Sequence, residues 1–479
     1  MKNFFLKVSA AVLLTSVIFI SSCRDDAPAL PDNLIQFESD QLGIGASEIE
    51  LTISLSLSRE ASEDATAVVE VAATGVANNV DFTTDPATST SNTITFNISK
   101  GALGLSFKLK KAADFFDGDD KIVFTLTTTP KSLVLGEKTR LSVSFSEIVA
   151  TSSSIQINGG GPTYPNKVFI DLSANRQTAV ARTKWDFGFS SSTDFRVTLN
   201  SSNGMMARVL DKTDLNAVTS ADTVGFGIQQ SMTSVFTGLN SVPKPDWLPT
   251  SINWIDAPSG DLTKTAIAEV SATASENKVY IVNLGDGPGI PATKLGWKKI
   301  RVLRNGSGYT LQHANIGATT FSEIQITKNT TFAFQYVSLT AGIVDVAPAK
   351  DKWDIAWSGF SNKFPSGDGY DVPYYFQDIV LQNTTGVQTV QIFNSTKSYD
   401  SFSESDLAAL DLGTQSQLKI GSNWRSGGGP TSGPSIRTDR YYIVKDGQGN
   451  YYKLKFTALT TNGERGKPVC EFSLLRKGI

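Results

Sequence analysis

Few residues of this sequence have the types and spacing that catalysis needs. Its 479 residues include one histidine, His313, so a Ser-His-Asp or Cys-His-Asn relay would have a single candidate base. The two cysteines and this histidine lack the spacing of a zinc site. Carboxylate pairs are plentiful, and because their separation depends on the fold, glycoside hydrolysis stays open as a third alternative behind two binding functions. The sequence therefore predicts a protein that is not an enzyme.

Aromatic residues in turns and loops could form a shallow site for a flat ligand or a glycan face. They are Trp247, Trp254, Tyr370, Tyr374, Tyr375 and Trp424. Trp424 is the preferred exposed candidate, because it stands near glycines and beside Arg425, whose guanidinium can pair with a carboxylate. The alternative is that each ring packs in a core, which a β protein of this size requires.

The first residues predict where the protein resides. Lys2 and Lys7 precede an apolar run over residues 10–20, which is typical of a secretory signal and short for a permanent membrane helix. The following Ile20-Ser21-Ser22-Cys23 resembles the lipobox of bacterial lipoproteins. The resemblance implies a signal peptide over residues 1–22, lipid attachment at Cys23 and a tether over residues 23–33. Arg24-Asp25-Asp26 resembles the surface-export signals of lipoproteins of the Bacteroidota, which implies the outer face of the cell outer membrane.

A lipidated Cys23 leaves Cys470 without a partner for an intramolecular disulfide. Cys470 lies in the strand-like segment 469–472, so a buried, inert thiol is expected. The net charge is −3 and the basic residues are scattered, which argues against a nucleic-acid partner.

Short alternating segments rich in Val, Ile, Thr, Phe and Tyr recur along the chain, separated by Gly, Asn, Asp and Ser. This period-two pattern predicts an antiparallel, all-β protein. Residues 403–412 alone predict a helical turn or two. Asp446-Gly447 and Gly449-Asn450 predict a hairpin turn between two late strands.

Residues 34–148 predict an N-terminal sandwich of about seven strands, before a Ser/Gly-rich linker over residues 149–165. The segment resembles a Calx-beta-like, immunoglobulin-like module, through Val80-Asp81-Phe82, Thr93-Ile94-Thr95-Phe96 and the acidic turn 114–120 before the strand 122–126.

In calcium-binding members, acidic residues at one end of the sandwich chelate the ion. The resemblance implies a Ca²⁺ site at Asp81, Asp114, Asp117, Asp119 and Asp120, and hard oxygen ligands from several loops suit that ion. The family's paired acids are reduced here to one Asp before two Phe, and residues 43–45 lack the usual early Glu. The alternative is a solvated acidic turn in a spacer or adhesion module.

An internal duplication follows the linker. An opening strand at 166–172 and Lys184-Trp185-Asp186 return as a strand at 331–336 and Lys352-Trp353-Asp354, and a late strand at 277–282 returns at 439–444. The offsets are 168 between the tryptophans and 162 between Ile281 and Ile443. The Trp-Asp pair predicts a buried ring whose neighbouring acid accepts backbone hydrogen bonds. The pattern predicts two tandem units, residues 166–328 and 329–479.

Both units resemble the HmuY-type lipoproteins, the haem-capturing surface proteins of Bacteroidota, through the opening strand, the Lys-Trp-Asp strand and the late strand pair at 440–457. The resemblance implies haem as ligand, held by His or Met. Unit two has neither residue between 393 and 438. Unit one has Met205, Met206 and Met232, so Met232 with Met205 or Met206 is the candidate pair, and packing of apolar gaps is the alternative.

These features predict a noncatalytic, surface-anchored lipoprotein that binds a ligand. Capture of haem or a related porphyrin for an outer-membrane transporter is the first hypothesis. The alternative is an adhesion or scaffold lipoprotein that has kept the fold and lost the haem ligands.

Overall fold

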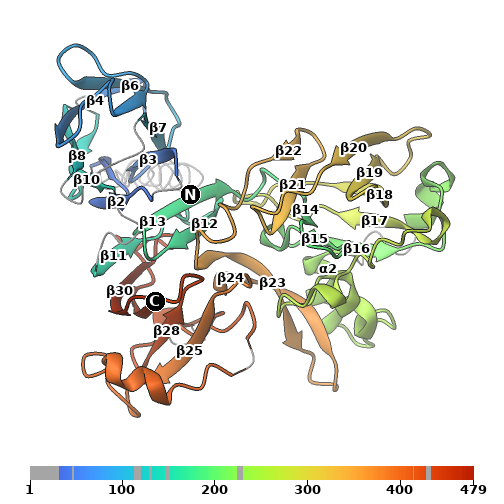
Figure 1. Cartoon of the computed structure of the whole chain (residues 1–479). Helices are drawn as coiled ribbons and strands as arrows, with labels where there is room; N and C mark the ends of the chain where they lie inside the picture. Colours follow the sequence, from blue (N-terminus) through green and yellow to red (C-terminus); the bar gives the residue numbers. More distant parts are fainter. Residues whose placement is uncertain are drawn as a thin grey trace, which may run out of the picture.

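The computed structural model describes residues 32–45, 48–112, 120–128, 132–145, 151–223, 230–413, 415–427 and 433–478. Cys23, the signal peptide and most of the tether lie outside these ranges. Within them, no helix is both long enough and apolar enough to span a membrane. The chain forms an N-terminal sandwich and two further lobes, as predicted for an all-β protein (Figure 1).

The N-terminal sandwich packs two five-stranded sheets face to face. The first has the order β5 (Phe82–Asp85), β7 (Gly104–Lys111), β3 (Glu50–Leu57), β1 (Leu34–Phe37) and β9 (Val134–Leu135). The second has the order β2 (Gln41–Gly43), β10 (Arg140–Ser144), β8 (Lys121–Thr128), β4 (Ala65–Thr74) and β6 (Thr93–Ile98). Alternate residues of β3, from Leu51 to Leu57, are buried between the sheets, as the pleat of a half-buried strand requires.

The rest of the chain forms a terminal lobe and a middle lobe. The terminal lobe contains one sheet of β11 (Ser152–Gln156), β30 (Val469–Arg476), β29 (Tyr451–Ala458), β28 (Arg440–Lys445) and β25 (Gln388–Phe393), and a second of β13 (Arg176–Ala181), β12 (Asn166–Asp171), β23 (Ile355–Pro365) and β24 (Asp371–Gln382). A short pair, β26 (Arg425–Ser426) and β27 (Ser435–Ile436), lies beside them. Strand β11 falls inside the segment predicted to be a linker.

The middle lobe contains one sheet of β15 (Val197–Leu199), β14 (Phe187–Ser190), β21 (Phe334–Ser338) and β22 (Gly342–Val344), and a second of β16 (Met206–Val209), β17 (Val279–Asn283), β18 (Trp297–Asn305), β19 (Gly308–Ala314) and β20 (Ser322–Ile326). Its long β16–β17 connection carries the helix α2 (Met232–Leu239), which the sequence analysis missed. Short 3-10 helices complete the chain: η1 (Ser201–Asn203), η2 (Leu215–Ala217), η3 (Ser220–Thr223), η4 (Leu248–Trp254), η5 (Leu262–Lys264), η6 (Ala274–Glu276) and η7 (Glu404–Ala409). Helix η7 lies in the predicted helical segment and begins with a Ser403/Asp406 capping box.

The two repeats exchange their opening hairpins. Strand β12 of the first repeat pairs with β23 of the second, and β21 of the second repeat pairs with β14 of the first. The registers are equivalent, because Ile170 faces Ile355 in one pair and Val337 faces Phe187 in the other. The predicted boundary at 328/329 is therefore not a boundary between separate bodies. Both opening strands alternate in the same way, so the period-two pattern alone does not show which of them pairs with each Trp-Asp strand.

The acids of the Trp-Asp motifs stabilise the exchanged pairing by hydrogen bonds to the backbone of the other repeat. The Asp354 carboxylate accepts a hydrogen bond from the Leu172 backbone N–H at 2.8 Å, and Asp186 accepts one from the Leu339 N–H at 2.8 Å. Trp185 and Asp354 are buried. The predicted hydrogen bond to the acid is confirmed in both repeats, and burial of the ring is confirmed for Trp185, whereas Trp353 is only partly buried.

Candidate ligand-binding site

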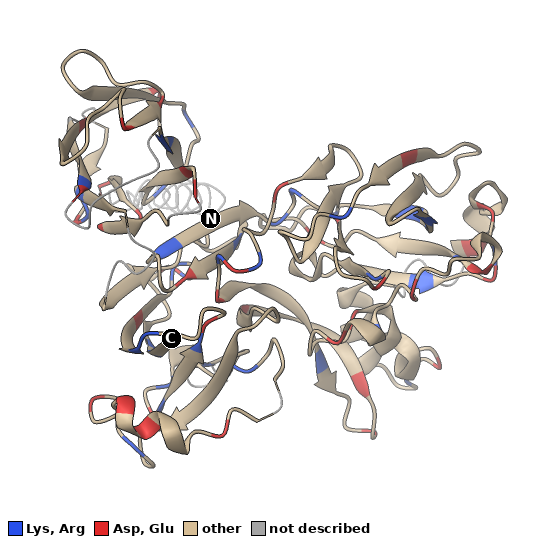
Figure 2. Ribbon diagram, viewed as in Figure 1, with Lys and Arg blue, Asp and Glu red and all other residues tan. Residues whose placement is uncertain are grey.

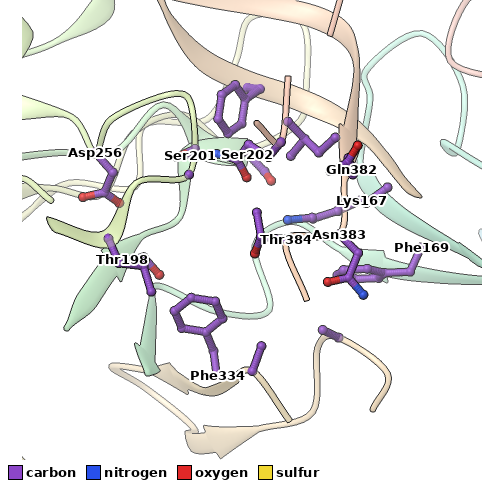
Figure 3. Close-up of a pocket in the computed structure, with 18 of the residues that line it drawn as sticks. Lys167, Phe169, Thr198, Ser201, Ser202, Asp256, Phe334, Gln382, Asn383 and Thr384 are labelled. Carbon is purple, nitrogen blue, oxygen red and sulfur yellow. The ribbon is translucent and has the colours of Figure 1, made fainter. Parts of the chain in front are cut away.

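A cavity of about 120 Å³ lies where the terminal and middle lobes meet (Figure 3). Strands β12 and β23 with the end of β24 form its wall on the terminal lobe, and β15, β21 and the loop 256–265 form its wall on the middle lobe. Both repeats contribute residues, so the cavity is a direct product of the hairpin exchange.

Two aromatic pairs shape the cavity. Trp185 contacts Tyr336 edge-to-face, with centroids 4.9 Å apart, and Phe169 contacts Trp353 in the same way at 5.1 Å. Each pair joins a ring of one repeat to a ring of the other. In edge-to-face packing the positive edge of one ring is attracted to the negative face of the other. These two pairs therefore fix the positions of the rings that line the cavity.

Two asparagines hold the tryptophan loops in equivalent ways. The Asn383 side-chain amide donates to the carbonyls of Lys350 and Trp353, both at 2.8 Å. The Asn200 amide donates to the carbonyls of Arg182 and Trp185, at 2.6 and 2.8 Å. These amides satisfy turn carbonyls that strand pairing leaves free, which fixes the position of each indole.

Lys167 projects into this aromatic space from β12. Its amine lies over the rings of Phe169 and Trp185, at 5.2 and 5.7 Å from their centroids. Among the described residues it has no hydrogen-bond or ion-pair partner, and burial lowers the pKa of its ammonium to about 8. Figure 3 shows the amine directed into the cavity, and Asp256 on the opposite side.

The Asp256 carboxylate serves the fold rather than the cavity. One oxygen accepts from the Leu199 N–H at 2.7 Å and the other from the Ala266 N–H at 2.9 Å. Burial raises the pKa of Asp256 to about 6, against the lowering effect of these two bonds. The bonds tie the loop 256–265 to β15 and keep this wall in place.

Two polar atoms of the lining residues lack partners within the described part of the chain. The Gln382 Oε1 and the Trp185 indole N–H are buried without a hydrogen bond, although the Gln382 amide nitrogen donates to the Val387 carbonyl at 2.8 Å. Buried polar groups are normally paired, so these two atoms are exceptions within the walls of the cavity.

The three methionines lie outside this cavity. Met205 is buried in the middle-lobe core with Phe187, whereas Met206 packs on the opposite face in a cluster with Met232 and Trp254. Adjacent strand residues point to opposite faces, which separates Met205 from the other two. Of the predicted pairs, only Met206 with Met232 shares one environment.

Trp424 and Arg425 are not an exposed site, and this expectation is wrong. Trp424 is 1% exposed, stacks on Phe456 at 4.4 Å between centroids and donates its indole N–H to the Asp378 carbonyl at 3.0 Å. Arg425 is buried, with its Nε 3.8 Å from the Asp378 carboxylate, which also contacts Arg465. The loop folds inward because burial of the apolar indole surface lowers the free energy of the folded state. Trp254 is likewise buried and stacks on Trp247.

The implied calcium site falls largely outside the described residues. Asp114, Asp117 and Asp119 lie there. Asp81 accepts a hydrogen bond from the Ala77 N–H at 2.8 Å, and Asp120 is buried with its carboxylate against Gly75, where it occupies the space that a Cβ would need. No cluster of three or more metal-ligating side chains occurs among the residues that the structure describes. The calcium site stays a prediction.

Sequence reasoning missed Lys167 as a site residue. The available signal was its position: β12 buries both faces around Val168 and Phe169, and a lysine in such a strand is unusual. Lys, Arg, Asp and Glu residues are spread over all three bodies in the described part of the chain (Figure 2).

Comparisons with known proteins give one family match and several distant structural neighbours. The model of the HmuY protein family matches residues 163–472, in one run through both repeats. No curated protein matches the sequence. A solved structure named as a HmuY-like haem-binding protein, from Bacteroides vulgatus, is 10% identical, covers 68% of this chain and 93% of that chain, and has a TM-score of 0.18. The apo Calx CBD1 domain is 14% identical, covers 24% of this chain and 97% of that domain, and has a TM-score of 0.21. Because the family model spans well over half of its residues, this chain belongs to the HmuY family.

Proposed function

We propose that this protein is a noncatalytic binding protein that holds a small, largely apolar ligand in the cavity between its two lobes. Family membership supports a binding role. The observation that carries the proposal is the aromatic lining drawn from both repeats. Concave, mostly apolar pockets with a few polar groups are typical of small-molecule sites.

The size of the cavity limits the ligand. Sites for drug-sized molecules measure roughly 300–1,000 Å³, whereas a buried apolar cavity of about 150 Å³ accepts benzene. At about 120 Å³ this cavity matches a ligand with a single ring. It contains neither His nor Met among its described lining residues, so it does not supply the usual axial donors for haem iron.

The test is a titration of the mature protein with single-ring compounds, followed by indole fluorescence, because Trp185 and Trp353 line the cavity. We expect saturable quenching in the wild type and its loss in Ala333→Phe, which fills the space. Ala341→Phe, at an exposed turn of the β21–β22 hairpin, is the matched control and should bind normally. Absence of quenching in the wild type, or equal binding by Ala333→Phe, contradicts the proposal.

Haem capture is a second candidate function, supported by the family match and by the shared cluster of Met206 and Met232. We expect ligation by this pair to shift the haemin absorption band on titration. Met232→Ala should remove the shift, and Met205→Ala should keep it, because Met205 packs in the separate middle-lobe core. No shift in the wild type, or one unchanged in Met232→Ala, excludes this pair.

We also propose that Cys23 carries the lipid that anchors the protein to the outer face of the outer membrane, from which the ligand would pass to a transporter. The supporting feature is the lipobox-like segment 20–23. Labelled palmitate should be incorporated by wild-type cells and not by cells that express Cys23→Ala. Protease added to intact cells should remove the protein, and protection from it argues against surface exposure.

A further inference from the structure

The Lys167 ammonium is the only cationic group among the described residues that line the cavity. Two carboxylates share the lining, and both are engaged elsewhere. Asp256 accepts two backbone N–H groups, and Asp261 accepts from Thr263 and lies 3.5 Å from the Lys264 ammonium. Neither carboxylate forms an ion pair with Lys167.

From this arrangement we infer that the ligand is an aromatic carboxylate, whose carboxylate pairs with Lys167 while its ring lies among Phe169, Trp185, Tyr336 and Trp353. The inference rests on the proposed binding function and names its ligand class. A buried charge is costly unless it is paired, and no described protein group pairs with this one. A ligand anion would supply the missing partner.

The contacts that Lys167 does make are weaker than those of an ion pair. The ring faces of Phe169 and Trp185 attract the ammonium, but burial still lowers its pKa, so these rings do not replace the lost hydration. A carboxylate beside the amine would raise that pKa again and provide a charge-assisted hydrogen bond. The aromatic residues beside the amine favour a ring there, and the rest of the lining includes uncharged polar residues such as Thr198, Ser201 and Gln417.

The position of the charges also orients the ligand. Lys167 and Asp256 lie on opposite sides of the cavity in Figure 3. The ligand carboxylate would therefore lie at the β12 side, away from Asp256. The ring would extend toward β21, where Phe334 and Tyr336 form the wall.

The test compares benzoate with benzamide, which have the same ring and differ in charge. By calorimetry, we expect the wild type at pH 7 to bind benzoate at least about tenfold more tightly than benzamide, as a charged hydrogen bond in a desolvated site allows. Lys167→Met should bring the ratio close to one, and Lys167→Arg should retain part of the preference. Lys184→Met, which removes an exposed lysine, is the matched control and should keep the wild-type ratio.

The pH dependence provides a second readout. Benzoate affinity should fall as the pH rises well above 8, as the ammonium loses its proton, whereas benzamide affinity should stay constant. Equal binding of the two compounds by the wild type, or an unchanged preference in Lys167→Met, overturns the inference and leaves the binding function intact. If neither compound nor any other single-ring probe binds, the proposed function itself fails.

Discussion

At the residue scale, Lys167 illustrates how a functional group is held at a cost in stability. A pKa of about 8 in the folded protein, against 10.5 ordinarily, means that the folded state binds this proton less tightly than the unfolded chain. One pKa unit corresponds to about 1.4 kcal/mol, so the charged lysine, which is only partly buried, costs at most about 3 kcal/mol. Proteins commonly retain such destabilising groups where they bind ligands.

Lys167→Met should therefore stabilise the protein. At pH 7 we expect its free energy of unfolding to exceed the wild-type value by up to about 3 kcal/mol, because the variant buries no charge. The difference should shrink as the pH rises from about 8 toward 10.5, where the unfolded chain loses its extra proton. Urea unfolding at several pH values measures it, with Lys184→Met as control. A difference that does not change with pH would show that burial of the charge is not its source.

Cys470 is a second residue whose behaviour follows from its surroundings. It is fully buried between Ile155 of β11 and Phe456 of β29, and burial raises the pKa of its thiol to about 12. The thiolate is the reactive form, so the native thiol should be inert. This agrees with the core role predicted from its strand pattern.

The prediction for Cys470 uses Cys23→Ala, which leaves one cysteine in the chain. We expect a thiol reagent such as dithiobis(nitrobenzoate) to label less than a tenth of the native protein, and one thiol per chain in guanidinium chloride, because only unfolding exposes it. Stoichiometric labelling of the native protein at pH 8 would contradict this.

At the element scale, the exchanged hairpins make the two repeats interdependent. Strand β14 pairs with β15 on one side and with β21 on the other, and β21 belongs to the second repeat. A chain cut at 328/329 would leave open edges and divide both aromatic pairs of the cavity. Exposed edges of this kind promote aggregation.

We expect residues 166–328 alone to lack cooperative unfolding, and an equimolar mixture with residues 329–479 to regain it. Circular dichroism during thermal unfolding would show both results. Independent cooperative folding of the first fragment would mean that the hairpin exchange is not needed for stability.

The hydrogen bonds of Asp186 and Asp354 across the exchanged hairpins lead to a second prediction at this scale. Asp186→Ala and Asp354→Ala should each destabilise the protein by about 1–3 kcal/mol, because each leaves a backbone N–H without its partner. Asp351→Ala, at an exposed position, is the control and should change stability by less than about 0.5 kcal/mol. Chemical denaturation would measure both losses. A negligible loss of stability in either variant would show that its hydrogen bond does not stabilise the exchanged pairing.

At the scale of the whole molecule, the N-terminal sandwich is attached to the terminal lobe by polar contacts. Arg176 pairs with Glu48 at 2.8 Å, and the Lys467 ammonium donates to the Ser58 carbonyl at 2.9 Å. Asn158 donates to Glu38, whose carboxyl is buried beside a cavity of about 320 Å³ between the two bodies. Burial raises the pKa of Glu38 from 4.5 to about 7, partly offset by Asn158 and Lys138.

This raised pKa predicts that docking of the sandwich depends on pH. The docked state binds the Glu38 proton more tightly than the undocked state, so docking is strongest below about pH 4.5 and weakens as the pH rises through 7. The penalty above pH 7 is at most about 3 kcal/mol. Asp40, Glu137, Lys138 and Lys467 also face this region, and Lys138 has a pKa lowered by burial.

Small-angle scattering should therefore show a larger radius of gyration at pH 8.5 than at pH 5.5. Glu38→Gln should remove this difference, because an amide has the hydrogen-bonding capacity without the charge. If the same expansion occurs in Glu38→Gln, another group controls docking.

The sequence by itself determined the local features of this protein. The alternating segments became strands, Asp446-Gly447 became the β28–β29 turn, and the segment containing Cys470 became a core strand, because a period of two and turn chemistry act over a few residues. The tertiary structure alone decided which repeat supplies the partner of each Trp-Asp strand, since both opening strands have the same period-two pattern. It also buried Trp424, and it placed Lys167 in an aromatic cavity built from both repeats. Those outcomes depend on long-range pairing and on burial, which no local pattern encodes.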